Sequence, residues 1–119
     1  KVLGISNELT QVIINLINNS KDAFIYNSIL LREINILTKQ EKGFALIEVH
    51  DNAGGIAKEN LDKIFEPYFT TKHKSRGTGL GLFMSRMICE QGLNGTLDVK
   101  SKKNITTFII KIPLDRYEK

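Results

Sequence analysis

The chain has 119 residues, of which 41% are apolar and 25% charged, as expected for one ordinary globular domain spanning residues 1–119. No apolar run approaches the roughly 20 residues that a membrane span requires, and no secretory leader is visible, so we expect a cytoplasmic domain without direct membrane contact. The single cysteine excludes an internal disulfide framework and a cysteine-based zinc site, and the net charge of +4, without tryptophan or a patterned basic face, does not indicate nucleic-acid binding.

Residues 7 to about 26 are predicted to form the first helix. Asn7 is a suitable N-cap, and Glu8 is favourable in the first turn. Apolar residues then recur at helical spacing and share one arc when turned by about 100° per residue, which predicts the core-facing side: Leu9, Val12, Ile13, Leu16 and Phe24.

Two strands are predicted next, over residues 30–37 and 44–50, with a polar turn over 38–43 between them. A glycine-containing turn over 51–56 ends the second strand.

The middle of the chain carries less regular signals. Residues 58–65 indicate a short helix, which Pro67 ends. Residues 70–81 are small, basic or glycine and show no hydrophobic periodicity, which predicts a mobile loop.

The last third predicts a helix over about 80–91, ended by Gly92, and an antiparallel pair of strands over 96–101 and 105–112. Helices combined with mostly antiparallel strands predict an α+β fold. We expect a two-layer α/β sandwich with the helices on one face of a mixed, mostly antiparallel sheet.

A polar stripe follows the first helix. Asn15, Asn19 and Asp22 stand at i, i+4 and i+7 and therefore share one face. A solvated helix face is one interpretation. However, asparagine is a poor helix former, and its amide oxygen can ligate Mg²⁺ without adding negative charge beside phosphates. The stripe is therefore also a candidate metal and phosphate site.

The turn after the second predicted strand is a candidate base-reading site. Gly54 and Gly55 allow a sharp turn and a close approach of the backbone to a flat ligand. Asp51 can accept a hydrogen bond from an exocyclic amine, which adenine has and guanine lacks at the same position. The alternative is an ordinary turn stabilised by the aspartate side chain.

The basic segment 70–76 and the glycine segment 77–82 are together a candidate phosphate site. Backbone N–H groups at a helix start, without Cβ atoms around them, form a concave anion site. The spacing is neither the dinucleotide fingerprint nor a P-loop, and the signatures of eukaryotic-type protein kinases are missing. The alternative for the basic segment is a solvated loop.

The order of these blocks resembles that of the GHKL ATPase superfamily and, within it, the sensor histidine kinases. The resemblance extends from about residue 7 to residue 113. The phenylalanine box is its most discriminating part, because topoisomerase, mismatch-repair and chaperone ATPases lack this form of it. The matching blocks are the N box 15–20, the first glycine box 51–56, the phenylalanine box 64–72, the second glycine box 77–82 and the closing Thr106-Thr107-Phe108.

The resemblance implies a role for each matching residue. Asp51 would bind the adenine amine, Asn19 would be the Mg²⁺ ligand, and Asn15 would support the phosphate and metal network. Lys72 would contact the phosphates from a lid over about 66–79, and Asn15, Asn19 and Lys72 would be the catalytic residues. The remaining implied ATP contacts are Asp22, Ala23, Gly55, Ile56, Thr71, Gly77, Thr78, Gly79, Leu80, Gly81, Leu82 and Thr107.

The implied function is that of a protein histidine kinase in a two-component phosphorelay. The domain would bind ATP and Mg²⁺ and transfer the γ-phosphoryl group to a histidine on a separate dimerisation domain of the same protein, which would pass it to a response regulator. The parent protein would be a homodimer, with room for an inner-membrane anchor elsewhere. Neither His50 nor His73 has the exposed helical setting of such an acceptor, so the domain alone is not expected to autophosphorylate.

Two residues depart from the family pattern. Ala53 stands where the first glycine box usually has a glycine, and Asp22 stands where many members have lysine or another polar residue. Two alternatives therefore stay open: a GHKL ATPase or serine-kinase module that acts on a protein partner, and a degenerate, non-catalytic nucleotide-binding or docking domain. In the family a strand usually precedes the first helix, so part of the sheet is expected outside residues 1–119.

Overall fold

The computed structural model describes residues 3–69 and 80–114 of the protein, with side chains from residue 7 onward. Two helices, four strands and two short helical turns follow one another along these residues. In chain order they are α1 (Leu3–Tyr26), β1 (Ile34–Glu41), β2 (Phe44–Asp51), the 3₁₀ turn η1 (Lys58–Asn60), α2 (Gly81–Met87), the π-helical turn η3 (Ile88–Gly92), β3 (Thr96–Lys102) and β4 (Ile105–Pro113).

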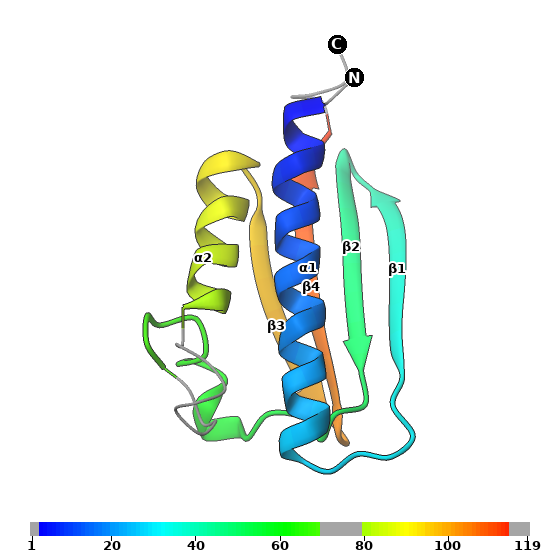
Figure 1. The fold of residues 1–119 in the computed structure, drawn as a ribbon. Coiled ribbons are helices and arrows are strands. Elements are labelled where there is room, and N and C mark those ends of the chain that lie inside the picture. Colours follow the sequence, from blue (N-terminus) through cyan, green and yellow to red (C-terminus); the bar gives the residue numbers. More distant parts are fainter. Residues whose placement is uncertain (1–2, 70–79, 115–119) are drawn as a thin grey trace.

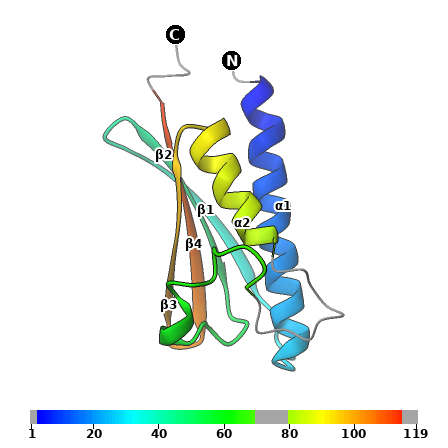
Figure 2. The ribbon, with the colours of Figure 1, turned by 90° about the vertical axis from the view of Figure 1, so that its left-hand side faces the viewer.

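The described strands form one sheet in the order β1-β2-β4-β3. Both α1 and α2 lie on the same face of this sheet, and the opposite face carries no helix among the described elements (Figures 1 and 2). This arrangement confirms the predicted two-layer α/β sandwich. The sheet was expected to be mixed, whereas every pairing among the described strands is antiparallel.

The core lies between α1, the sheet and the α2 helix. The arc predicted for α1 faces it: Val12 and Leu16 are fully buried, and Phe24 is 3% exposed. Facing residues of β2 and β4 alternate with outward ones, as a half-buried strand requires. The buried cluster consists of Val12, Leu16, Ile47, Val49, Ile64, Phe65, Cys89, Leu93, Leu97, Phe108, Ile110 and Ile112.

The helix α1 begins at Leu3, so Asn7 lies inside it and the prediction that Asn7 caps the helix is wrong. A side chain that is able to cap does not prevent the preceding residues from adopting helical dihedrals, and no proline blocks them here. The predicted end of the helix near residue 26 is confirmed.

The first strand was predicted four residues too early. It begins at Ile34 and continues to Glu41, so the turn to β2 is only Lys42-Gly43, both at positive φ as a tight two-residue hairpin requires. Leu30 and Leu31 lie in the connection before it and are 91% and 87% exposed. Their apolar character suggested a strand, but the strand that pairs with β2 starts after them, at Ile34, and includes the polar residues up to Glu41.

The segment predicted as a helix over 58–65 is helical only as η1, after which successive turns bring the chain to Phe65. Ile64 and Phe65 are buried, and the Phe65 ring packs edge-on against Phe108 with centroids 6.3 Å apart. The predicted helix over 80–91 and the final strand pair are confirmed, although the last helical turn, η3, is π-helical.

Within the described ranges, no helix combines the length and apolar character that crossing a bilayer would require.

Candidate functional site

Asp51 is the last residue of β2 and one of the most buried charged groups of the described chain, with 4% exposure. Its two carboxylate oxygens receive one donor each. The Ser20 hydroxyl on α1 donates to Oδ2 at 2.5 Å, and the backbone N–H of Ala53 donates to Oδ1 at 3.1 Å. The carboxylate is therefore held in one orientation, and each oxygen keeps acceptor capacity for a further donor.

The turn after Asp51 is fastened to neighbouring elements. The Asn27 side-chain amide, just beyond α1, donates to the Ala53 carbonyl at 2.6 Å, and the Gly54 N–H donates to the Asn104 carbonyl at 3.3 Å. Ala53 is 2% exposed and has a negative φ. An alanine therefore fits this position without strain.

Gly55 is a glycine for reasons internal to the chain. Its φ is 74°, and a Cβ there would lie 2.9 Å from the Ser101 hydroxyl oxygen and 3.3 Å from the Asn104 Cα. The same Ser101 hydroxyl accepts a hydrogen bond from the Ile56 N–H at 2.7 Å. The turn thus packs closely on the β3–β4 hairpin, and this packing alone requires a glycine at position 55.

Asn15, the first residue of the polar stripe of α1, contacts α2. The side-chain Nδ2 of Asn15 donates to the Ser85 hydroxyl at 3.1 Å, and the side-chain Oδ1 of Asn15 accepts from the Gln11 side chain at 3.1 Å. Ser85 is fully buried on α2. Asn19 and Asp22, further along the same stripe, are half-buried. Asn15 therefore lies at the junction of two helices, and the stripe as a whole is partly buried, which disfavours the interpretation as a simple solvated face.

The start of α2 brings the end of the glycine segment to the same junction. Leu80 and Leu82 are half-buried, and Leu82 packs against the core. Gly81, the first residue of α2, is exposed, and a Cβ there would meet nothing within 4 Å. Of the predicted lid over about 66–79, only residues 66–69 are described, and Thr71, Lys72, Gly77, Thr78 and Gly79 lie outside the described residues.

Thr107 lies on the sheet face opposite to the helices, so the structure does not bring it to the base-reading turn. It pairs with His50 across β2 and β4, and its hydroxyl lies 3.0 Å from the His50 Nδ1. Its neighbour Thr106 pairs with Asp51, shares the inward face and is 5% exposed. The alternation of buried and less buried residues in β4 shows which of the two threonines faces inward. The assignment of Thr107 from the family resemblance did not take this alternation into account.

A small charged network lies on that opposite face. The His50 Nε2 lies 2.9 Å from the Glu48 carboxylate, and the Lys39 amine lies 3.5 Å from it. The hydrogen bond with His50, followed by the charge of Lys39, holds the pKa of Glu48 below its ordinary value. His50 is therefore engaged on both ring nitrogens, away from α1 and α2.

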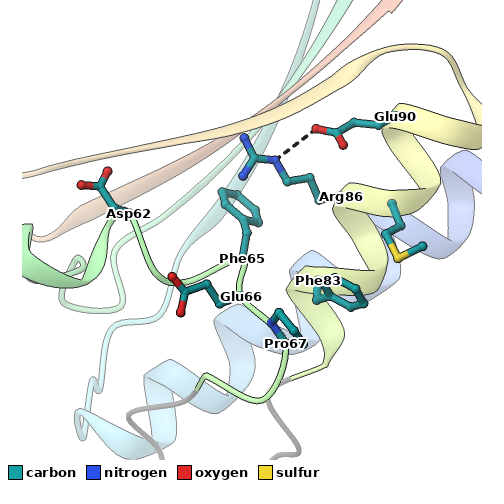
Figure 3. Close-up of a pocket in the computed structure, with 8 residues that line it drawn as sticks. Asp62, Phe65, Glu66, Pro67, Phe83, Arg86 and Glu90 are labelled. Atoms are coloured by element: carbon teal, nitrogen blue, oxygen red, sulfur yellow. Dashed lines mark ion pairs between the residues drawn. The ribbon is translucent and has the colours of Figure 1, made fainter.

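A pocket of about 300 Å³ lies between the segment after η1 and α2 (Figure 3). The Arg86 guanidinium stacks over the Phe65 ring at 4.4 Å and pairs with Glu90 at 3.3 Å. The predicted lid contributes Glu66 and Pro67 to this pocket, whereas none of the residues predicted to contact ATP or Mg²⁺ lines it. Its lining is Asp62, Phe65, Glu66, Pro67, Phe83, Arg86, Met87 and Glu90.

The described residues contain no cluster of three or more histidine, cysteine or acidic side chains that would hold a metal ion by themselves. Mg²⁺ at nucleotide sites usually takes one or two protein oxygens and completes its shell with phosphates and water. The half-buried Asn19 on α1 offers one amide oxygen, and this donor set fits a metal ion that is bound together with a nucleotide.

Comparison with known proteins identifies the family. The model of histidine kinase-, DNA gyrase B- and HSP90-like ATPases matches residues 4–116. A two-component sensor, PprA of Pseudomonas aeruginosa, is 38% identical over 116 residues, or 95% of this chain and 12% of its own. The sensor histidine kinase ZraS of Escherichia coli is 39% identical over 109 residues, or 90% of this chain and 22% of its own. The chain thus spans under a quarter of the length of these relatives.

Solved structures agree with this result. The nucleotide-free catalytic domain of the histidine kinase ThkA superposes with a TM-score of 0.75 at 32% identity, covering 91% of this chain and 67% of that one. The fold described above is therefore that of a histidine kinase catalytic domain.

Proposed function

The chain belongs to the family of histidine kinase-, DNA gyrase B- and HSP90-like ATPases, and on this premise we propose that it is the ATP·Mg-binding catalytic domain of a two-component sensor histidine kinase. In the proposed reaction the γ-phosphoryl group of ATP passes to a histidine on the dimerisation domain of the same protein, and from there to a response regulator. The buried, doubly hydrogen-bonded Asp51 carboxylate is the observation that supports the nucleotide site most directly.

Asp51 is proposed to read the adenine base. A carboxylate whose two oxygens already hold one protein donor each offers further acceptor positions to the exocyclic amine of adenine. Guanine presents a carbonyl oxygen in that place, which the carboxylate repels. We assign Thr106, in place of Thr107, to the same wall of the pocket because it shares the inward face with Asp51. The other proposed wall residues are Ala23, Gly55, Ile56, Leu80 and Leu82.

The phosphates are proposed to lie along the junction of α1 and α2. Asn15 contacts Ser85 of α2, Asn19 and Asp22 follow Asn15 in the same stripe of α1, and Gly81 is the first residue of α2. Gly81 does not have a positive φ, and a Cβ there would meet no atom within 4 Å. The described fold therefore does not itself require a glycine at this position. Glycine destabilises a helix relative to alanine, so the close approach of a ligand to the backbone would explain why this residue is a glycine. Further contacts are proposed from Thr71, Lys72, Gly77, Thr78 and Gly79.

Phosphoryl transfer depends mainly on positioning and charge stabilisation. The bond between the γ-phosphorus and its bridging oxygen breaks, ADP leaves, and a bond forms from phosphorus to an imidazole nitrogen of the acceptor. Mg²⁺, when bound, neutralises charge on the phosphates, and Asn19 would hold it. His50 is not proposed as the acceptor because both of its ring nitrogens are engaged on the opposite sheet face.

Transfer of labelled γ-phosphate tests this proposal. The chain is incubated with Mg²⁺ and labelled ATP, with and without the separately produced histidine-bearing segment of its parent protein. We expect label on that segment and none on the chain alone. Asn19→Ala should abolish the transfer, whereas Asn18→Ala, which alters an exposed neighbour on α1, should preserve it. Label on a histidine of the isolated chain at a comparable rate would contradict the proposal.

A further inference from the structure

Two serines are fully buried among the described residues, and each contacts a predicted site residue. Ser85 on α2 accepts the Asn15 amide, and Ser20 on α1 donates to Asp51. A buried hydroxyl destabilises a protein unless it is hydrogen-bonded, so its partner indicates why it is retained. For Ser20 that partner is the carboxylate proposed to read the base.

Ser20 interrupts the apolar stripe of α1. Val12, Leu16 and Phe24 precede and follow it at intervals of four residues or their multiples, and all four side chains point into the core. Alanine is a better helix former than serine and would need no hydrogen-bond partner at this position. The one polar residue of the stripe therefore lies where α1 contacts the Asp51 carboxylate at the end of β2.

The geometry restrains the Asp51 side chain from two directions. The Ser20 hydroxyl holds Oδ2 from α1, and the Ala53 N–H holds Oδ1 from the turn. A serine in a helix often donates its hydroxyl hydrogen to a carbonyl of the preceding turn. Here the hydroxyl has given its only hydrogen to Asp51, which fixes the rotation of the carboxylate plane and hence the directions of its remaining acceptor positions.

We propose that Ser20 is a positioning residue for adenine recognition, and that its hydroxyl orients the Asp51 carboxylate toward the exocyclic amine of the base. This inference rests on the proposed function, in which Asp51 binds that amine. Without the hydroxyl, the carboxylate keeps the Ala53 N–H but loses its restraint from α1. Recognition of the amine then weakens, whereas binding of the sugar and phosphates does not.

The test compares two nucleotides on the 119-residue chain by titration calorimetry: ATP and purine riboside triphosphate, which lacks the exocyclic amine. The dissociation constant for purine riboside triphosphate divided by that for ATP measures recognition of the amine. We expect Ser20→Ala to reduce this ratio by about threefold to tenfold, the contribution of an ordinary hydrogen bond. The affinity for the amine-free nucleotide should stay within about twofold. Ser85→Ala deletes the hydroxyl of the other buried serine and should keep the wild-type ratio.

The outcomes separate the two levels of the proposal. A wild-type ratio in Ser20→Ala, or an equal loss for both nucleotides, overturns the positioning role and leaves the proposed function standing. Equal binding of the two nucleotides by the wild-type chain overturns base reading by Asp51 itself, and the role of Ser20 with it. Since alanine is smaller and favours the helix, Ser20→Ala is expected to fold, and thermal unfolding of each variant verifies this.

Discussion

Gly81→Ala should stabilise the fold and weaken ATP binding at the same time. A Cβ at this position would meet nothing within 4 Å, and the residue is the first of α2. Alanine in a helix is more stable than glycine by about 0.5–1 kcal/mol, which corresponds to a rise of about 2–6 °C in the unfolding temperature. If phosphates approach this backbone, the added methyl group overlaps them at a cost of about 1–3 kcal/mol, or roughly 5- to 150-fold in affinity.

The assay is thermal unfolding and ATP titration on the same protein preparation. Gly95→Ala is the matched control, because a Cβ there would overlap the backbone carbonyl oxygen of Lys111, so this variant should lose stability. A lower unfolding temperature for Gly81→Ala would refute the argument that the fold leaves room at this position. A higher unfolding temperature with unchanged ATP affinity would refute the argument that a ligand needs the glycine.

Three further predictions follow from buried or paired charges. Asp51→Asn, which keeps the shape of the side chain, should weaken ATP binding by about 1.5–3 kcal/mol, or 10- to 150-fold, and unchanged affinity in calorimetry would count against base reading. Burial raises the pKa of Cys89 to about 12, so thiol reagents should label the native chain far more slowly than the unfolded chain. The stability that this thiol contributes is complete below pH 9 and is lost as pH rises toward 12, because the unfolded state ionises first. His50→Ala should raise the lowered pKa of Glu48 toward 4.5 in an NMR titration. In the wild-type chain, the stability that the ionised Glu48 contributes is present above pH 4.5 and is lost as pH falls through the lowered pKa.

Periodicity predicted the parts of the fold that are buried on one side. The apolar arc of α1 and the final hairpin follow from spacing alone, because each buries one face against the core. The edge strand β1 escaped this reasoning. Seven of its eight residues are exposed, so no alternation marks it, and the exposed Leu30 and Leu31 imitated a strand start. The helix α1 begins earlier than predicted because no residue before the predicted start prevents a helix. The sequence carries no positive signal for such an extension.

The candidate site was predictable where a motif carries its own chemistry. Asp51 and the asparagine stripe were found from residue type and spacing, and the structure brings each into contact with a buried serine. Ser20 and Ser85 were not found, because their bonds join residues 31 and 70 positions apart in the chain. Their contacts depend on how α1 packs on the sheet and on α2.

Titration calorimetry of the chain with ATP, with GTP and with ATP in the absence of Mg²⁺ tests the central claim most directly. The account predicts binding that prefers ATP and tightens with Mg²⁺, since Asp51 would read the base and Asn19 would hold the metal ion. A folded chain that binds no ATP, or binds GTP equally well, would contradict it.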